Sequence, residues 1–70
     1  MNWRLIYNET TVIDLFETND VTLTPYKVYE SKNIEDCFKI IDSNKLFFIY
    51  YLSETESILF ENGIRTIVNN

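Results

Sequence analysis

The chain has 70 residues, with six Lys and Arg against eleven Asp and Glu, and a formal net charge of −5 at pH 7. This length predicts one domain (residues 1–70), because separate hydrophobic cores need roughly 50 residues each. The acidic balance argues against direct binding to nucleic acid or to an anionic membrane, since both rely on Lys and Arg. With 46% hydrophobic residues, one Gly and one Pro, the chain is expected to fold.

The first residues predict two strands. Apolar side chains alternate over residues 3–7, and β-branched residues are frequent over residues 11–17. Strict alternation on the second strand would divide its apolar side chains between two sides: Ile13 and Leu15 on one, Val12 and Phe16 on the other. A polar turn cluster follows at residues 17–20.

A third strand is less clearly marked. Residues 21–24 are compatible with an extended segment, and residues 26–30 repeat a weak strand pattern. Pro25 lacks a backbone N–H, so any strand at this point is expected to be short or to lie at an edge.

One helix is expected in the middle of the chain. Its apolar stripe has the spacing i, i+3, i+4, i+7 and consists of Ile34, Cys37, Phe38 and Ile41. Ser31 or Asn33 is expected to cap its start, and Asn44 to end it. Glu35 and Asp36 lie in the first turn, where the helix dipole favours carboxylates, and Glu35 has the i,i+4 spacing to pair with Lys39.

The C-terminal part predicts a meander of three strands. Residues 45–52 are apolar on both faces, which indicates a central strand. Alternation places Phe47, Ile49 and Tyr51 on one face, and Leu46, Phe48, Tyr50 and Leu52 on the other. Asn62-Gly63 is a strong signal for a type I′ hairpin turn between residues 57–61 and 64–68.

The predicted fold class is therefore α+β: a small antiparallel sheet of about five strands, in the order ββ(β)αβββ, with one helix packed on one face. A helix of about ten residues is about 15 Å long, whereas five strands span about 19 Å. One such helix cannot cover both faces. We therefore expect either that the sheet curls into a small barrel or that its second face meets another protein.

The sequence offers little for catalysis. It has no histidine, and its one cysteine, Cys37, lies on the apolar stripe, where a buried structural thiol is the favoured interpretation. The single Gly belongs to the hairpin turn, so no Gly-rich phosphate loop exists. We predict no enzyme activity, no cofactor and no metal site.

Six carboxylates in the first half fall outside the predicted core and are the candidate partner-binding residues: Asp14, Glu17, Asp20, Glu30, Glu35 and Asp36. On one surface they could imitate a phosphate track, so we predict a partner protein with a basic surface and no direct contact with nucleic acid or membrane. The alternative is a self-associating structural or accessory subunit, a homodimer formed through the second sheet face.

The absence of alanine, with eight Asn and nine Ile, suggests an AT-rich coding sequence, as in a bacteriophage or a low-GC bacterium. This favours a phage-type inhibitor that occupies a nucleic-acid-binding site on a host or defence protein. No signal-peptide pattern is visible, so a cytoplasmic location is expected.

Overall fold

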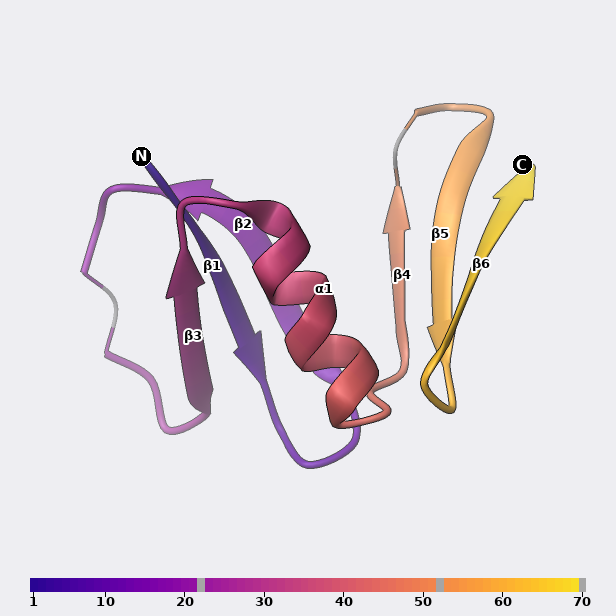
Figure 1. The fold of residues 1–70 in the computed structure, drawn as a ribbon. Helices are drawn as coiled ribbons and strands as arrows, with labels where there is room; N and C mark the ends of the chain where they lie inside the picture. The colour runs from indigo at the N-terminus through magenta and orange to yellow at the C-terminus, as the bar shows by residue number, and fades with distance from the viewer. Residues whose placement is uncertain (22, 52, 70) are drawn as a thin grey trace.

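In a computed structural model, which describes residues 1–21, 23–51 and 53–69, these residues form six strands and one helix (Figure 1). The elements in chain order are β1 (Asn2–Tyr7), β2 (Val12–Thr18), β3 (Lys27–Ser31), α1 (Ile34–Ser43), β4 (Phe48–Tyr51), β5 (Glu56–Glu61) and β6 (Ile64–Asn69). The α+β class and the predicted element order are confirmed. Both chain termini lie at the same end of the molecule, above the strands in Figure 1.

The described strands form two antiparallel sheets, each three-stranded, in the orders β2-β1-β3 and β4-β5-β6. The single sheet of about five strands that the sequence predicted is therefore not confirmed. The two sheets touch at one parallel bridge between Thr11 and Phe47. There the Phe47 N–H donates to the Thr10 carbonyl at 2.9 Å, and the Val12 N–H donates to the Phe47 carbonyl at 3.3 Å.

The turn between β1 and β2 is organised by one side chain. The Asn8 Oδ1 accepts hydrogen bonds from the backbone N–H groups of Thr10, at 3.0 Å, and Thr11, at 2.7 Å. The Asn8 N–H in turn donates to the Thr11 carbonyl at 3.0 Å. An asparagine side chain that replaces backbone partners in this way fixes a tight reversal of the chain.

A β-bulge in β2 changes which side chains face the core. The register with β1 shifts between Ile6 and Tyr7, so Ile13 has no partner on the opposite strand. Val12 then lies on the same side as Leu15 and is 6% exposed, whereas Ile13 is 45% exposed. The predicted grouping of Ile13 with Leu15 was wrong, because the extra residue of a bulge interrupts the alternation of side chains.

Strand β3 begins shortly after Pro25 and pairs antiparallel with β1. The preceding residues Val21, Leu23 and Thr24 belong to a connection rather than a strand, and Thr22, which was also expected to be extended, lies outside the described residues. As expected from the proline, β3 lies at an edge of its sheet.

Helix α1 buries the predicted stripe. Cys37, Phe38 and Ile41 are its buried residues, and Ile34 is half-buried. Asn33 is the N-cap but makes no side-chain cap hydrogen bond. The Ser31 hydroxyl accepts the Asn33 N–H at 3.2 Å.

The helix ends at Asn44, as predicted, and the following residue takes a left-handed conformation, with Lys45 at φ 54°. The Lys45 N–H donates to the Asp42 carbonyl at 3.2 Å, and the Leu46 N–H donates to the Ile41 carbonyl at 3.0 Å. This hydrogen-bond pair is a Schellman motif, and Leu46 and Ile41 are both fully buried, which supplies its usual apolar contact.

The C-terminal sheet is the predicted three-strand meander, but its central strand is β5. The segment predicted as the central strand forms only β4, which lies at the edge of this sheet. Its contact with the N-terminal sheet is the bridge between Phe47 and Thr11, just before β4 and β2 begin. The Asn62-Gly63 turn has φ 54° and φ 78°, as a type I′ turn requires.

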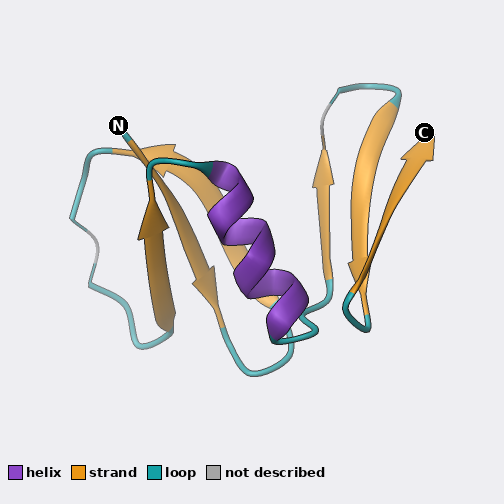
Figure 2. Ribbon diagram, in the orientation of Figure 1, coloured by secondary structure: helices purple, strands orange, loops and turns teal. Residues whose placement is uncertain are grey.

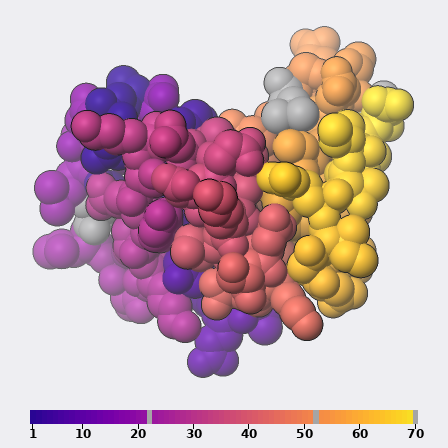
Figure 3. Space-filling model, viewed as in Figure 1, coloured from indigo at the N-terminus to yellow at the C-terminus, as the bar shows by residue number. Residues whose placement is uncertain are grey.

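Both sheets pack one face against α1, which lies between them in Figures 2 and 3. The ring of Phe38 lies 5.3 Å from the ring of Phe60 on β5 and 5.9 Å from that of Tyr50 on β4. The buried core consists of Leu5, Val12, Leu15, Cys37, Phe38, Ile41, Leu46 and Phe60. We call the side of the molecule that carries α1 the helix side and the opposite side the outer side.

Among the described residues, no helix has the length and apolar character needed to cross a lipid bilayer.

Candidate interaction surface

The six predicted carboxylates do not share one surface. Asp14 lies opposite Ile6, and Glu30 opposite Arg4, which places both on the outer side of the N-terminal sheet. Asp20 belongs to the connection that crosses this side. By the same alternation Glu17 lies on the helix side, with Glu35 and Asp36 of α1. The hypothesis of a single acidic track made of all six residues is therefore not supported by their placement.

Glu30 pairs with a buried arginine on the outer side of the N-terminal sheet. Its Oε1 lies 3.4 Å from Nη2 of Arg4, a residue that is only 2% exposed. The Arg4 guanidinium also lies over the ring of Phe16, 5.8 Å from its centroid, and donates to the backbone carbonyl of Asp20. The contact with Asp20 ties the start of the β2–β3 connection to the outer side, so Arg4 and Glu30 have a structural role.

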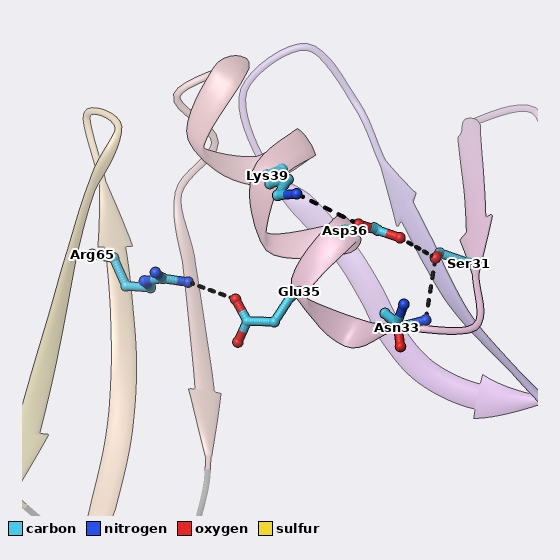
Figure 4. A network of polar contacts seen from close by, with 6 residues as sticks. All are labelled: Ser31, Asn33, Glu35, Asp36, Lys39 and Arg65. Carbon is cyan, nitrogen blue, oxygen red and sulfur yellow. Dashed lines mark hydrogen bonds and ion pairs between the residues drawn. The ribbon is translucent and has the colours of Figure 1, made fainter.

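The two carboxylates of the first helical turn also have partners within the chain (Figure 4). Glu35 lies 3.6 Å from Arg65 of β6, and Asp36 lies 3.8 Å from Lys39. The Ser31 hydroxyl donates to Asp36 Oδ2 at 2.6 Å. Lys39 was expected to pair with Glu35 but contacts Asp36, while Glu35 joins the helix to the C-terminal sheet.

Positive charge is distributed unevenly between the two sides. Lys39 is on α1, Arg65 faces the helix side opposite Phe60, and Lys27 faces it opposite Tyr7. Lys32 and Lys45 directly precede and follow the ends of the helical region. The sixth cation, Arg4, is on the outer side but is buried and neutralised by Glu30. The strands of the outer side therefore expose carboxylates without exposed cations among the described residues.

The outer side of the C-terminal sheet exposes a group of apolar side chains. We call the outer patch the set of five residues Phe47, Ile49, Tyr51, Leu59 and Ile64, which strand alternation places on this side. Tyr51 is 69% exposed and Ile64 66% exposed. The predicted division of the 45–52 segment is confirmed for its described residues, because Leu46, Phe48 and Tyr50 pack on the core, and Leu52 lies outside the described residues.

Carboxylates flank the outer patch on two sides. Glu61 shares the outer side of β5 with Leu59. Asp14 lies on the outer side of β2, three residues after the bridge that joins β2 to β4. A shallow hollow of about 240 Å³ beside the patch is lined by Leu59, Glu61, Asn62, Ile64 and Thr66. Glu61 was not among the predicted carboxylates. Its position directly before the Asn62-Gly63 turn pairs it with Ile64, and this pairing places it on the outer side.

The one cysteine of the chain lies inside the fold and not on this surface. Cys37 is fully buried, and desolvation together with the nearby Asp36 carboxylate raises the pKa of its thiol to about 11, so it is protonated and inaccessible at neutral pH. Within residues 1–21, 23–51 and 53–69, no three His, Cys, Asp or Glu side chains gather as they would around a metal ion.

Comparison of the chain with protein-family models, with curated proteins and with solved structures finds no match.

Proposed function

We propose that the chain is a protein-binding module without a catalytic role, and that it docks through its outer side on a basic protein surface. The observation that supports this most is the outer patch flanked by Asp14 and Glu61, on a side whose strands expose no cation among the described residues. An apolar centre with carboxylates at its margins complements a partner that carries an apolar patch between Lys and Arg side chains.

Proteins that hold nucleic acid carry such basic surfaces, since Lys and Arg contribute most of that affinity. Occupation of a nucleic-acid-binding site, as by a phage-type inhibitor, is the activity that this chemistry fits best. The carboxylates that support it are Asp14 and Glu61, with Asp20 nearby. Glu30, Glu35 and Asp36 already have partners within the chain.

The test compares two charge reversals on one strand. Asp14→Lys changes the outer side of β2, and Glu17→Lys makes the same change on the helix side, at a residue that is also exposed. Proteins retained from a host lysate by the wild type should be lost with Asp14→Lys and with Glu61→Lys but kept with Glu17→Lys. Binding to the purified partner should also weaken with salt, because exposed charges are screened within about 8 Å at physiological ionic strength.

Two results would contradict the proposal. One is that the wild type retains no protein beyond an unrelated acidic control at low salt. The other is that Glu17→Lys abolishes binding while Asp14→Lys and Glu61→Lys leave it unchanged, which would move recognition to the helix side.

Self-association is a second candidate, favoured by the exposed apolar side chains of the C-terminal sheet. A homodimer that buries the outer patch would persist at high salt, since apolar burial does not depend on charge. Tyr51→Ser should then shift the mass measured by light scattering towards that of the monomer.

A further inference from the structure

Strand β6 leaves one backbone edge without a partner among the described strands. It pairs with β5 on one side only and is the outermost strand of the C-terminal sheet (Figure 1). A two-residue hairpin turn closes on a hydrogen-bonded pair, here Glu61 and Ile64, and such pairs alternate along the ladder. The N–H and C=O groups of Arg65 and Ile67 therefore point away from β5, towards the open edge.

Of the usual devices that prevent pairing with another strand, this edge lacks a proline and a bulge, and its one charge is the ion-paired Arg65, whose side chain is 42% exposed. The β5–β6 register is continuous, and the strand contains no proline. The Arg65 side chain lies on the helix side. Its Nη1 is 3.6 Å from Oε2 of Glu35, and its Cζ is 5.6 Å from the ring centroid of Phe38.

Both sides of β6 also expose a large apolar side chain. Ile64 lies on the outer side and Ile67 on the helix side, and both are more than half exposed. An added strand would cover both, so backbone pairing and apolar burial favour the same contact.

We propose that β6 pairs antiparallel with β6 of a second copy of this chain, with Thr66 on the twofold axis, to give one continuous six-stranded sheet. Directly opposite residues share a face, so the axis must pass through a residue of β6. An axis at Arg65 would set two guanidinium groups opposite each other. An axis at Ile67 would place Ile64 opposite a position beyond the strand.

The axis at Thr66 avoids both problems. It sets Arg65 opposite Ile67 of the second copy, and these are the residues whose backbone groups face the open edge. It also sets Ile64 opposite Val68 of the second copy on the outer side. A strand edge buries less than the roughly 800 Å² per partner of a standard interface, so the dimer is expected to be weak and to exchange rapidly. It does not rest on the proposed function, because it uses the backbone edge of β6 and covers only Ile64 of the outer patch.

The first test is cross-linking. In a Cys37→Ala background, Thr66→Cys places two thiols across a pair with closely spaced Cα atoms, which suits a disulfide. Mild oxidation should give a covalent dimer. Thr55→Cys, an exposed position in the β4–β5 turn, is the matched control and should remain monomeric. Equal yields from the two variants would overturn the proposal.

The second test needs no cysteine. Sedimentation equilibrium of the wild type should show an average mass that rises with concentration from 8.4 kDa towards twice that value. Ile67→Lys adds a charge at the open edge and should remain at the monomer mass with an unchanged circular dichroism spectrum. A wild type that stays monomeric at millimolar concentration, or an Ile67→Lys variant that dimerises equally well, would refute the β6 contact.

Discussion

The two sheets have the same number of strands and pack on the same helix, yet their outer sides differ. On the N-terminal sheet, Arg4 is buried on the outer side, where it contacts Glu30 and the Asp20 carbonyl at the start of the β2–β3 connection. The C-terminal sheet is joined by short turns, of which Asn62-Gly63 is the shortest, and its outer patch stays exposed. The two outer sides therefore differ in one feature above all: the first holds a buried, ion-paired arginine, and the second exposes an apolar patch without one.

The largest effect is expected where both sheets depend on one side chain. Phe38 contacts Phe60 and Tyr50 of the C-terminal sheet and belongs to the core that the N-terminal sheet shares. Phe38→Ala should lower the free energy of unfolding by about 3–5 kcal/mol, close to the whole stability of a small domain. Urea denaturation monitored by circular dichroism measures this, with the exposed Tyr51→Ala as control. A variant whose unfolding midpoint in urea stays close to that of the wild type would show that Phe38 does not belong to the core.

The second effect concerns the helix that both sheets share. The pKa of Cys37 is about 11, above an ordinary 9.0. The folded state therefore keeps a proton that the unfolded state releases, so stability is complete below about pH 9 and falls as pH rises towards 11. Two pKa units correspond to about 2–3 kcal/mol.

The comparison is with Cys37→Ala, whose stability should decline less steeply above pH 9. Equal slopes for the two proteins would show that the Cys37 thiol does not govern this dependence. Native wild type should also resist thiol reagents until it unfolds.

The N-terminal sheet can be destabilised without a change in the C-terminal sheet. Glu30→Gln removes the carboxylate beside Arg4 and should cost about 1–2 kcal/mol, a modest value because Glu30 itself is partly exposed. Amide hydrogen exchange should rise in the β2–β3 connection and stay unchanged in β5. Glu17→Gln, on the opposite side of the same sheet, is the control and should change little. Uniform exchange across both sheets would mean that Arg4 does not hold this connection specifically.

The link between the sheets can be strengthened. Lys45 occupies a left-handed conformation that glycine adopts at lower cost. Lys45→Gly should raise the free energy of unfolding by about 0.5–1 kcal/mol in chemical denaturation. A loss of stability would show that the contacts of the Lys45 side chain, whose Cγ is close to Gly63, outweigh the backbone strain.

The smallest effect on stability is expected on the outer side of the C-terminal sheet. Tyr51→Ser in the outer patch should change the free energy of unfolding by less than about 0.5 kcal/mol, because the side chain is mostly in solvent. A larger loss in thermal denaturation would mean that Tyr51 supports the fold and that the outer patch is not simply an interaction surface.

Local patterns predicted much of this fold. The stripe through Phe38 and Ile41, the stop at Asn44 and the Asn62-Gly63 turn each depend on a few neighbouring residues, and all three are confirmed. The bulge at Ile13 could not be predicted, since it depends on how β1 and β2 align across the Asn8 turn. The division into two sheets likewise depends on where the chain leaves the helix after residue 45.

The candidate site was predicted less well, because sequence position does not specify a face. Asp14 and Glu17 lie on one strand, yet the register places them on opposite sides. The burial of Arg4 depends on a connection that returns across β1, and nothing local to residue 4 indicates it. Glu61 was not among the predicted residues, because its side of the sheet follows only from the β5–β6 register.

The placement of both termini at one end of the molecule has a mechanical consequence. A force that separates the ends acts across the strands, not along them. It should open β6 from β5 one pair at a time, beginning where Asn69 faces Glu56. Held by its ends, the molecule should therefore yield at low force, because the pairs of the β5–β6 ladder break one after another and not all at once.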